Sequence, residues 1–461
     1  MKTGSVFCKG GTHMVKDKNF YKTLLLIALP VAFQNLISFG LNMSDTVMVG
    51  KLGEVALSGV ALANQVSFIV GKFIGGVSGG TAVLISQYWG KRDMDRIRTV
   101  FAIGLKVCFT FSAVITLVCA FFPEFILSLF TNEQAIIEAG AGYLRIVCFS
   151  YLTMSVSTTL LSMLRGVEVV KIALIVSICS FFVNLAMNYV FIFGKFGAPR
   201  MGVNGAGLST LITRVIEFLV VLFYVFCCEK RVAFKPKDIL RNNYDLWKDF
   251  GKYGVPIVIG DLLWGLVGNF KAGIMGHLGS QAVSANSMTD VVLELAMIFI
   301  WGLGAGACVI IGKTVGAGNY KLARQYSNTL QLLFFGFGFV AALFVYFIRG
   351  IAISFYNVTD ATKEVAEQFM VIGAITTWAT AYAATCFTGI NRGAGDGNFV
   401  VLVDLICGWL VVLPLAAIAA FWLKLPAPIV FLCTRIDQFV KVIIAFLRLR
   451  SNRWIRNVTR E

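Results

Sequence analysis

Polar side chains that could bind ions interrupt the long apolar stretches of this sequence. Asp45 lies in "NMSDTVMVGKLG", near the end of an apolar run that begins at Phe20. An ionised side chain near the centre of a bilayer costs about 2.5 to 3.5 kcal/mol, so it needs a partner, a cavity or a proton. A carboxylate in a confined cavity could take up a proton from alternate sides, whereas one at the membrane interface would simply be hydrated. On the residues alone, both interpretations of Asp45 are open.

Asn184 and Asn188 are four residues apart, which places both carboxamides on one face of a helix. Together they could hydrogen-bond a single carboxyl group or offer oxygens to a small cation. They could equally do no more than join neighbouring helices. Three further residues of this half are candidates for the lining of a substrate cavity: Gln34, Asn64 and Gln65.

The second half of the chain carries charges inside its apolar segments as well. Asp261 and Lys271 share one segment, and Asp290 and Glu294 lie one helical turn apart in the next. A salt bridge from Lys271 to one of these acids would neutralise both groups. Alternatively, the four side chains contribute to a substrate or ion site.

Two other charge pairs are expected. Arg214 and Glu217 are three residues apart on one predicted helix and should neutralise each other. Arg435 could form a bridge to Asp404.

The elements that must position these side chains are transmembrane helices. The chain has 461 residues, of which 58% are hydrophobic and 14% charged, and its mean hydropathy is +0.80, which is far from a soluble domain. Apolar stretches long enough to cross about 30 Å of hydrocarbon recur almost without pause. We predict an all-α membrane protein with twelve transmembrane helices, at 20–49, 56–88, 99–121, 134–164, 169–194, 204–228, 246–276, 281–312, 326–348, 363–391, 398–422 and 426–447.

The formal net charge of +16 reflects membrane topology. Lys and Arg gather in the N-terminal tail, in 91–98, in 229–241 and in 448–460, whereas the intervening connections carry few of them. This alternation places both termini in the cytoplasm of a multi-pass inner-membrane protein. It also argues against nucleic acid as a partner.

An internal repeat divides the chain into two halves. Residues 29–60 align with 255–286 at a constant offset that pairs Pro30 with Pro256 and Asp45 with Lys271. Because each half has six helices, both enter the membrane with the same orientation and form two six-helix bundles related by a parallel repeat. Pro30 and Pro256, inside helices, are candidate hinges or static kinks. The glycine-rich stretches 75–80 and 302–306 predict close helix packing through small residues.

These observations divide the chain into five parts. They are a cytoplasmic N-terminal tail (1–18), an N-terminal six-helix lobe (19–228), a basic cytoplasmic linker (229–245), a C-terminal six-helix lobe (246–448) and a basic cytoplasmic tail (449–461).

Catalytic and metal chemistry are not predicted. The two histidines, His13 and His277, have no ligand-like spacing, and the eleven cysteines lack a C-x-x-C pair and lie mostly in apolar helices. We therefore expect no enzyme activity, no cofactor and no metal beyond a coupling ion.

The chain resembles the multidrug and toxic compound extrusion (MATE) transporters. The features that carry the resemblance are the two halves of six helices, "SDTVMVGKLG" at the end of the first helix and "NLAMNYVFIFGKFGAPRMGVNGAGLST" at 184–210. It covers residues 18 to 448 and implies a monomeric secondary antiporter that exports lipophilic, cationic small molecules in exchange for protons or Na⁺. It also implies that Asp45, with Asn184 and Asn188, couples transport to the ion, which for Na⁺ would be held there.

Departures from the family pattern leave the bacterial subfamily open between DinF-like and NorM-like members. NorM-like members carry two acids in the C-terminal lobe where this chain has Trp264 and Ala381, and DinF-like members often have an Asp at the position of Asn188. Coupling is therefore expected to rest on the N-terminal lobe. A flippase for a lipid-linked or amphipathic metabolite is the alternative, because Lys271 and Arg145 could contact an anionic headgroup. A passive channel is not favoured.

Overall fold

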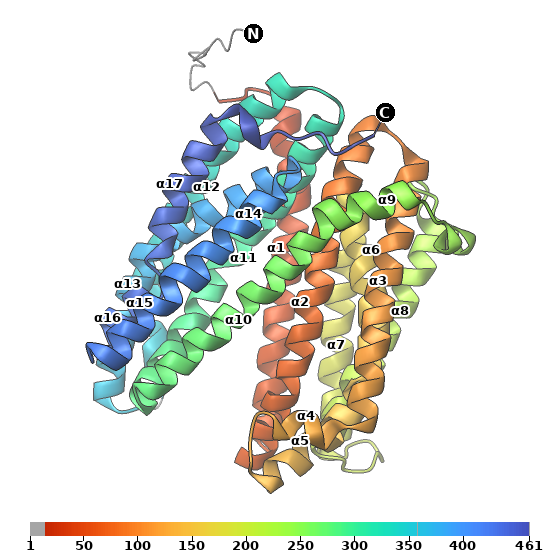
Figure 1. Ribbon diagram of the computed structural model, residues 1–461. Coiled ribbons are helices and arrows are strands. Elements are labelled where there is room, and N and C mark those ends of the chain that lie inside the picture. The colour runs from red at the N-terminus through yellow and green to blue at the C-terminus, as the bar shows by residue number, and fades with distance from the viewer. Residues whose placement is uncertain (1–13, 357, 461) are drawn as a thin grey trace.

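The regular elements are all helical in the residues that this computed structural model describes, 14–356 and 358–460. Most of the predicted N-terminal tail lies outside the described residues. The first half of the chain forms one bundle (Figure 1), with helices α1 (Lys18–Gly50), α2 (Glu54–Lys91), α3 (Met94–Phe121), α4 (Pro123–Ser128), α5 (Gln134–Val147), α6 (Phe149–Gly166), α7 (Lys171–Phe193), α8 (Val203–Phe223) and the π-helical η1 (Tyr224–Cys228).

The second half forms the other bundle. Its helices are α10 (Val255–His277), α11 (Ser280–Gly316), α12 (Tyr320–Ser354), α13 (Asp360–Thr385), α14 (Gly397–Leu405), α15 (Leu413–Ala417), α16 (Ala427–Cys433) and α17 (Asp437–Arg450), with π-helical turns η4 (Cys386–Asn391), η5 (Ile406–Val412) and η6 (Ile418–Trp422). The short elements η2 (Pro236–Leu240), α9 (Tyr244–Asp249) and η3 (Phe250–Gly254) connect the bundles, and η7 (Asn452–Trp454) follows α17.

The predicted spans are helical over most of their length, but two of them are not single straight helices. Ten helices among the described residues are long and apolar enough to cross a membrane, and α5 with α6, bent by 49°, makes an eleventh. The predicted segment 426–447 consists instead of α16 and α17, interrupted at 434–436. The all-helical membrane architecture is thus confirmed, with a broken last segment.

Pro256 lies inside a continuous helical span, Tyr244–His277, as predicted. It follows the π-helical turn η3 directly and stands in the first turn of α10. Because helical turns precede it, Pro256 leaves a carbonyl of the preceding turn without its usual N–H partner. Pro30 is likewise inside α1 as expected.

The two bundles meet closely at the end of the molecule that carries both termini, which we call the terminal face (Figure 1). Small residues make this approach feasible, because a Cβ on Gly80 of α2 would come within 2.6 Å of Gly254 Cα. Likewise, a Cβ on Gly306 of α11 would lie 3.1 Å from Leu24 on α1. The predicted role of these glycines in close helix packing is confirmed.

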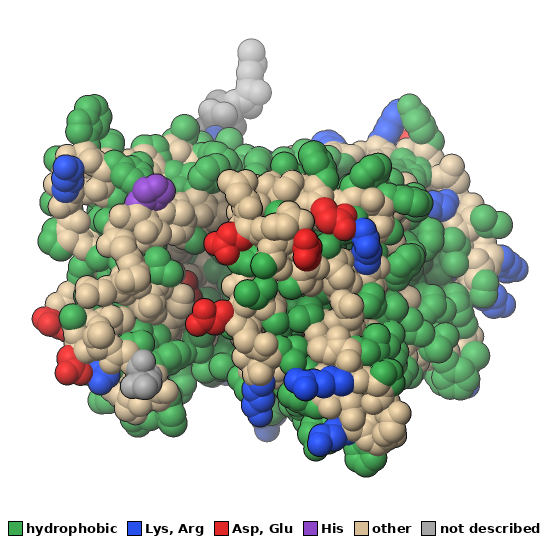
Figure 2. All heavy atoms as spheres, turned by 90° about the horizontal axis from the view of Figure 1, so that it is seen from below, with side chains coloured by type: hydrophobic (Ala, Val, Ile, Leu, Met, Phe, Trp, Pro, Cys, Tyr) green, Lys and Arg blue, Asp and Glu red, His purple; other side chains and the backbone are tan. Residues whose placement is uncertain are grey.

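The opposite end, here called the open face, is hollowed. Figure 2 looks onto this end and shows a depression near the middle, with acidic side chains at its rim. On α1 the buried side chains show the change between the two ends: six of them lie between Phe20 and Ala32, and only Val49 is buried in the rest of this helix.

Helix α1 belongs to both bundles. Its first turns, with Leu24 and Ala28, are part of the apolar core of the C-terminal bundle, and its later turns pack against α7. Pro30 lies between these two regions. A bend at Pro30 would therefore change how the two bundles are connected.

The linker is docked on the N-terminal bundle. Arg98 Nε on α3 donates to the Val232 carbonyl at 2.8 Å, and Lys106 Nζ donates to the Arg241 carbonyl at 2.7 Å. The linker thus follows α3, and the chain enters the C-terminal bundle through α9 and η3.

Candidate ion and substrate sites

Asp45 contacts one of the two asparagines that the sequence places on one face of α7. Asn188 Nδ2 donates to Asp45 Oδ1 at 2.5 Å and to Asn184 Oδ1 at 2.9 Å. The nitrogen of Asn188 must face both partners, because a carboxylate and an amide oxygen only accept hydrogen bonds. The prediction that the two carboxamides share a face is confirmed, but only Asn188 hydrogen-bonds the carboxyl group, and Asn184 bonds Asn188.

The hydrogen bond between Asn188 and Asp45 leaves oxygen atoms of both side chains available to bind a cation. Asn184 and Asn188 are almost completely buried, and Asp45 is half-buried. Asn188 Oδ1 is buried and has no hydrogen-bond partner among the described residues. A buried acceptor beside a carboxylate suits a small cation such as Na⁺, and the carboxylate alone suits a proton. No cluster of three or more His, Cys, Asp or Glu side chains suited to a metal occurs in the described residues.

Polar groups from the other helices of the bundle surround this contact. The Tyr143 hydroxyl on α5 donates to Asn64 Oδ1 on α2 at 3.4 Å, and it lies close enough to Asp45 for an electrostatic interaction. On α8, Arg214 Nη1 lies 2.7 Å from Glu217 Oε2, which confirms the predicted pair. Arg214 also acts electrostatically on Asp45. Helices α1, α2, α5, α7 and α8 thus contribute to one polar region.

Tyr143 is a member of this region that sequence reasoning missed. A single tyrosine in an apolar segment is usually a core residue, and no spacing links it to Asp45. Of the other candidate residues in the N-terminal half, only Asn64 contacts this polar region, through its hydrogen bond with Tyr143. Gln65 is exposed on α2, and Gln34 Oε1 on α1 is buried without a partner among the described residues.

The acids of the C-terminal bundle are paired with arginines that the sequence did not assign to them. Arg392 Nη2 lies 2.6 Å from Asp261 Oδ1, and Arg435 Nη2 lies 3.7 Å from Asp290 Oδ1. Asn286 Nδ2 also donates to Asp290 at 2.7 Å. A salt bridge to Lys271, one of the two interpretations of these acids, is therefore not formed with Asp261 or Asp290.

The suggested bridge from Arg435 to Asp404 is wrong. Asp404 instead forms an ion pair with Lys441 Nζ on α17, at 2.9 Å. Lys441 Nζ also contacts Asp437 Oδ2 at 3.0 Å. Lys441 and Asp437 are almost completely buried, and Asp437 Oδ1 has no partner among the described residues. The carboxylates of Asp404 and Asp437 thus share the ammonium of Lys441, and this attraction offsets part of the cost of burying the charges.

Lys271 and Glu294 are the two candidate residues of the C-terminal bundle that form no ion pair with the described residues. Neither takes part in any of the ion pairs found within residues 14–356 and 358–460. Lys271 is half-buried on α10, and Glu294 is exposed on α11.

Lys72 on α2 is another charged residue that sequence reasoning missed, although it interrupts the predicted apolar span 56–88. Its ammonium lies 5.0 Å from the ring centre of Phe68 and 5.3 Å from that of Trp264 on α10, so it joins the two bundles by cation–π contacts. It also interacts electrostatically with Asp261 and Glu294. Trp264 thus has a partner in the opposite bundle.

Two repeat-related helix bundles, closed at one face and hollowed at the other, with ionisable side chains between them, define a membrane transporter. The MatE family model matches the chain twice, at residues 30–190 and 256–418, which is one match in each bundle and more than half of the chain in total. The chain belongs to the MatE family, the multidrug and toxic compound extrusion transporters.

Relatives and solved structures agree with this assignment. A probable multidrug resistance protein NorM of Bacillus anthracis is 24% identical over 87% of this chain and 88% of its own length. An uncharacterised transporter, YisQ, of Bacillus subtilis strain 168 is 23% identical over 98% of each chain. The crystal structure of MATE in complex with MaL6 superimposes with a TM-score of 0.85 at 17% identity, over 94% of this chain and 96% of that one.

Proposed function

We propose that this chain is a secondary antiporter that exports lipophilic, cationic compounds in exchange for protons or Na⁺. The contact of Asp45 with Asn188 carries the proposal, since it joins a carboxylate on α1 to a buried carboxamide on α7 beside an unused acceptor oxygen. The family and the relatives named as multidrug resistance proteins support the export of drugs.

The proposed mechanism begins with ion binding at Asp45. A proton or Na⁺ on the carboxylate changes its hydrogen bond to Asn188, and with it the fit of the later turns of α1 against α7. Because the first turns of α1 pack in the C-terminal bundle, a bend at Pro30 transmits this change to the other lobe. The lobes then rock about the central cavity and expose it to the other side.

The proposed orientation follows from charge. The basic segments 91–98, 229–241 and 448–460 gather at the terminal face, which we assign to the cytoplasm of a bacterial cell. The open face then points outward, where protons or Na⁺ enter down their gradient. One charge moving inward across 100 mV supplies about 2.3 kcal/mol, enough to drive useful export of a monovalent compound.

The test is transport by reconstituted protein with separately imposed pH and Na⁺ gradients. Asp45→Asn keeps the shape of the side chain but removes its charge, so gradient-driven efflux of a cationic dye should fall to the level of empty vesicles. Asp360→Asn is the matched control, because its side chain is 98% exposed at the start of α13. Unchanged coupled efflux by the folded Asp45→Asn protein would remove Asp45 from the mechanism.

Export of an amphipathic or lipid-linked metabolite is the second candidate, and Lys271 is the observation that favours it. An ammonium without an ion pair could hold an anionic headgroup. Arg145 gives no such support, because it pairs with Glu124 at 2.7 Å. Movement of a fluorescent anionic lipid between leaflets in the same vesicles would distinguish this activity from dye export.

A further inference from the structure

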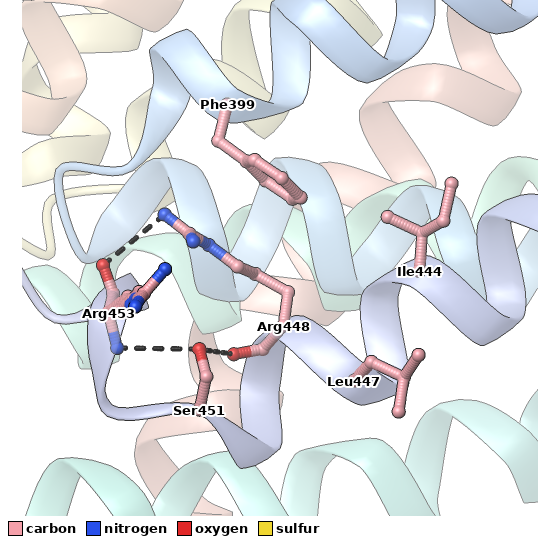
Figure 3. A pocket seen from close by; sticks show the side chains of 6 residues that line it. All are labelled: Phe399, Ile444, Leu447, Arg448, Ser451 and Arg453. Atoms are coloured by element: carbon pink, nitrogen blue, oxygen red, sulfur yellow. Dashed lines mark hydrogen bonds between the residues drawn. The ribbon is translucent and has the colours of Figure 1, made fainter.

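A strap, residues 453–460, follows α17 and crosses the terminal face from one bundle to the other (Figure 1). The chain leaves α17 in a tight turn (Figure 3), where Ser451 Oγ donates to the Arg448 carbonyl at 2.7 Å and accepts from the Arg453 amide at 3.4 Å. The Arg448 guanidinium lies 4.2 Å from the ring centre of Phe399 and donates to the Arg453 carbonyl at 3.3 Å. These contacts fix the direction in which the strap leaves the helix.

The first half of the strap is anchored in the C-terminal bundle. Trp454 is buried in the apolar core of that bundle. The Arg456 amide donates to the Ala394 carbonyl at 2.9 Å, and the Arg456 guanidinium lies 3.2 Å from Asp396 Oδ1. Asp396 is completely buried and also binds Arg448 at 2.7 Å. Because a buried tryptophan and a buried carboxylate shared by two arginines are costly to separate, this anchor is firm.

One side chain of α2 binds the middle of the strap. Gln87 is completely buried, and its carboxamide accepts from the Val458 amide at 2.8 Å and donates to the Arg456 carbonyl at 3.2 Å. Gln87 Nε2 also donates to the Gly393 carbonyl of the C-terminal bundle at 3.2 Å. The strap therefore passes from one bundle to the other at the point where Gln87 bonds both.

The end of the strap lies on the N-terminal bundle. Val458 is buried in the apolar core that this bundle forms. The Arg460 carbonyl accepts from Lys91 Nζ at the end of α2, at 2.9 Å, and from Arg96 Nη1 on α3. The Arg460 amide donates to the Tyr88 hydroxyl of α2 at 3.4 Å. The backbone and one apolar side chain thus join the strap to the ends of α2 and α3.

The side chain of Arg460 binds the short helix that precedes α10. Its Nε and Nη2 form a bidentate pair with Asp249 of α9, at 2.7 and 2.9 Å, and its Nη1 lies 2.9 Å from Asp245. The Arg460 side chain is 40% exposed, so water competes for these contacts. They are therefore easier to break than the buried ion pairs of Asp396.

We infer that the strap is a latch that stabilises the state closed at the terminal face, and that its end releases the N-terminal bundle when this face opens. Trp454 and Asp396 hold the first half on the C-terminal bundle, whereas Val458 and the half-exposed Arg460 hold the end. The end is the part that separates, because its contacts are the less costly to lose. This inference rests on the alternating access of the proposed function.

Distances between spin labels test the latch. Lys171 and Lys321 are exposed at the terminal face, one on each bundle, and Lys171→Cys with Lys321→Cys provides the label sites. Other cysteines that could react are first replaced by serine: Cys8, Cys179, Cys227, Cys228, Cys308 and Cys433. The double variant Val458→Ser with Arg460→Ala weakens only the end of the strap and keeps the bond from Gln87 to Gly393. It should raise the ratio of long to short distances about tenfold, as expected when the burial of a valine is lost.

Two further variants serve as controls for the distances. Arg453→Ala removes an exposed arginine of the same segment, and the hydrogen bonds found for Arg453 among the described residues use its backbone. It should leave the ratio at the wild-type value. Arg460→Lys keeps Val458 and a cation beside Asp249, and should lie closer to wild type than the double variant. A wild-type distribution in the double variant, or an equal change with Arg453→Ala, would overturn the latch.

Two cross-links show which part of the strap is released. Lys91→Cys with Arg460→Cys allows a flexible bifunctional thiol reagent to join the end of the strap to α2. Tyr320→Cys with Asn457→Cys joins the strap to α12 of the C-terminal bundle, where Asn457 Nδ2 donates to the Tyr320 hydroxyl at 3.4 Å. The first cross-link should stop efflux of a cationic dye from proteoliposomes, and the second should leave it unchanged. Any other pattern in protein that transports before cross-linking would overturn the release of this end.

The two measurements separate the latch from the proposed function. The label distances do not depend on which compound is exported. Absence of dye efflux under every gradient would therefore refute the antiporter, while the latch would still be decided by the distances. Conversely, unchanged distances in a double variant that transports normally would overturn the latch and leave the antiporter intact.

Discussion

At the scale of single residues, the two bundles place opposite charges at one repeat-related position. Asp45 of α1 contacts Asn188, whereas Lys271 of α10 lies among Asp437, Arg435 and Lys441 without an ion pair in the described chain. The bundles share a backbone plan, but the chemistry at this position differs. The carboxylate is suited to a cation and the ammonium to an anionic group, so the two lobes are expected to have separate tasks.

The two asparagines of α7 should differ in their importance for the proposed ion coupling. Asn188 donates directly to Asp45, and Asn184 reaches it only through Asn188. Because a hydrogen bond to a charged group contributes about 1.5 to 3 kcal/mol, Asn188→Ala should lower ion-coupled efflux by about tenfold or more. Asn184→Ala should have a clearly smaller effect in the same vesicle assay, and equal losses in the two variants would contradict this order.

At the scale of elements, close helix approach decides which positions tolerate a side chain. A Cβ on Gly80 of α2 would come within 2.6 Å of Gly254, whereas one on Gly75 of the same helix would meet nothing within 4 Å. Both glycines interrupt an α-helix, so their intrinsic cost is the same. The difference between them is tertiary.

Gly80→Ala should therefore destabilise the protein by about 1 to 3 kcal/mol, as overpacking does. Gly75→Ala is its matched control and should be neutral or stabilising by up to about 1 kcal/mol. Thermal unfolding in detergent, followed by tryptophan fluorescence, measures both. A lower Tm for Gly75→Ala than for Gly80→Ala would contradict the packing described for α2 and η3.

The linker provides a prediction that depends on pH. Burial opposes ionisation of Asp238, but the Lys235 amide at 2.8 Å and the Arg241 guanidinium at 2.7 Å outweigh burial and hold the pKa of this carboxyl below its usual value. A lowered pKa stabilises the folded protein above the usual carboxyl range, and this contribution is lost as the pH falls through the folded-state pKa.

Asp238→Asn should consequently lower the Tm at neutral pH, by an amount equivalent to about 1.5 to 3 kcal/mol. The difference from wild type should shrink as the pH falls through the carboxyl range, because the protonated wild type then resembles the variant. Asp360→Asn, at an exposed position, should show neither effect. A difference in Tm that grows toward low pH would contradict this assignment.

At the scale of the whole molecule, the proposed alternating access requires the contacts at the terminal face to open. Besides the strap, an ion pair joins the bundles there, between Lys313 Nζ of α11 and Glu168 Oε1 after α6, at 2.7 Å. Cysteines at these two positions, joined by a short bifunctional thiol reagent in a background without the exposed native cysteines, should stop transport. Reduction of the bridge should restore it, and Lys313→Cys alone should respond to neither step. Full activity with a complete bridge would show that this face does not open.

The sequence by itself determined the features that depend on local spacing. Apolar segments of sufficient length predicted the helices, and the repeat predicted two bundles, which the two family matches support. Residues three or four apart must share a helical face, so the pairs Asn184 with Asn188 and Arg214 with Glu217 could be read directly.

Only the tertiary structure decided which groups meet across helices. Asp261 and Arg392 are far apart in the sequence, and no spacing distinguishes Arg392 from the other cations as the partner of this acid. Tyr143 and the strap became visible for the same reason, since their contacts depend on how whole helices pack. The π-helical turn η3 before Pro256 was not predicted by any residue pattern either. Helical periodicity depends only on residues that are close in the sequence. Which of several similarly charged side chains becomes a partner depends on the distances between helices in the folded bundles.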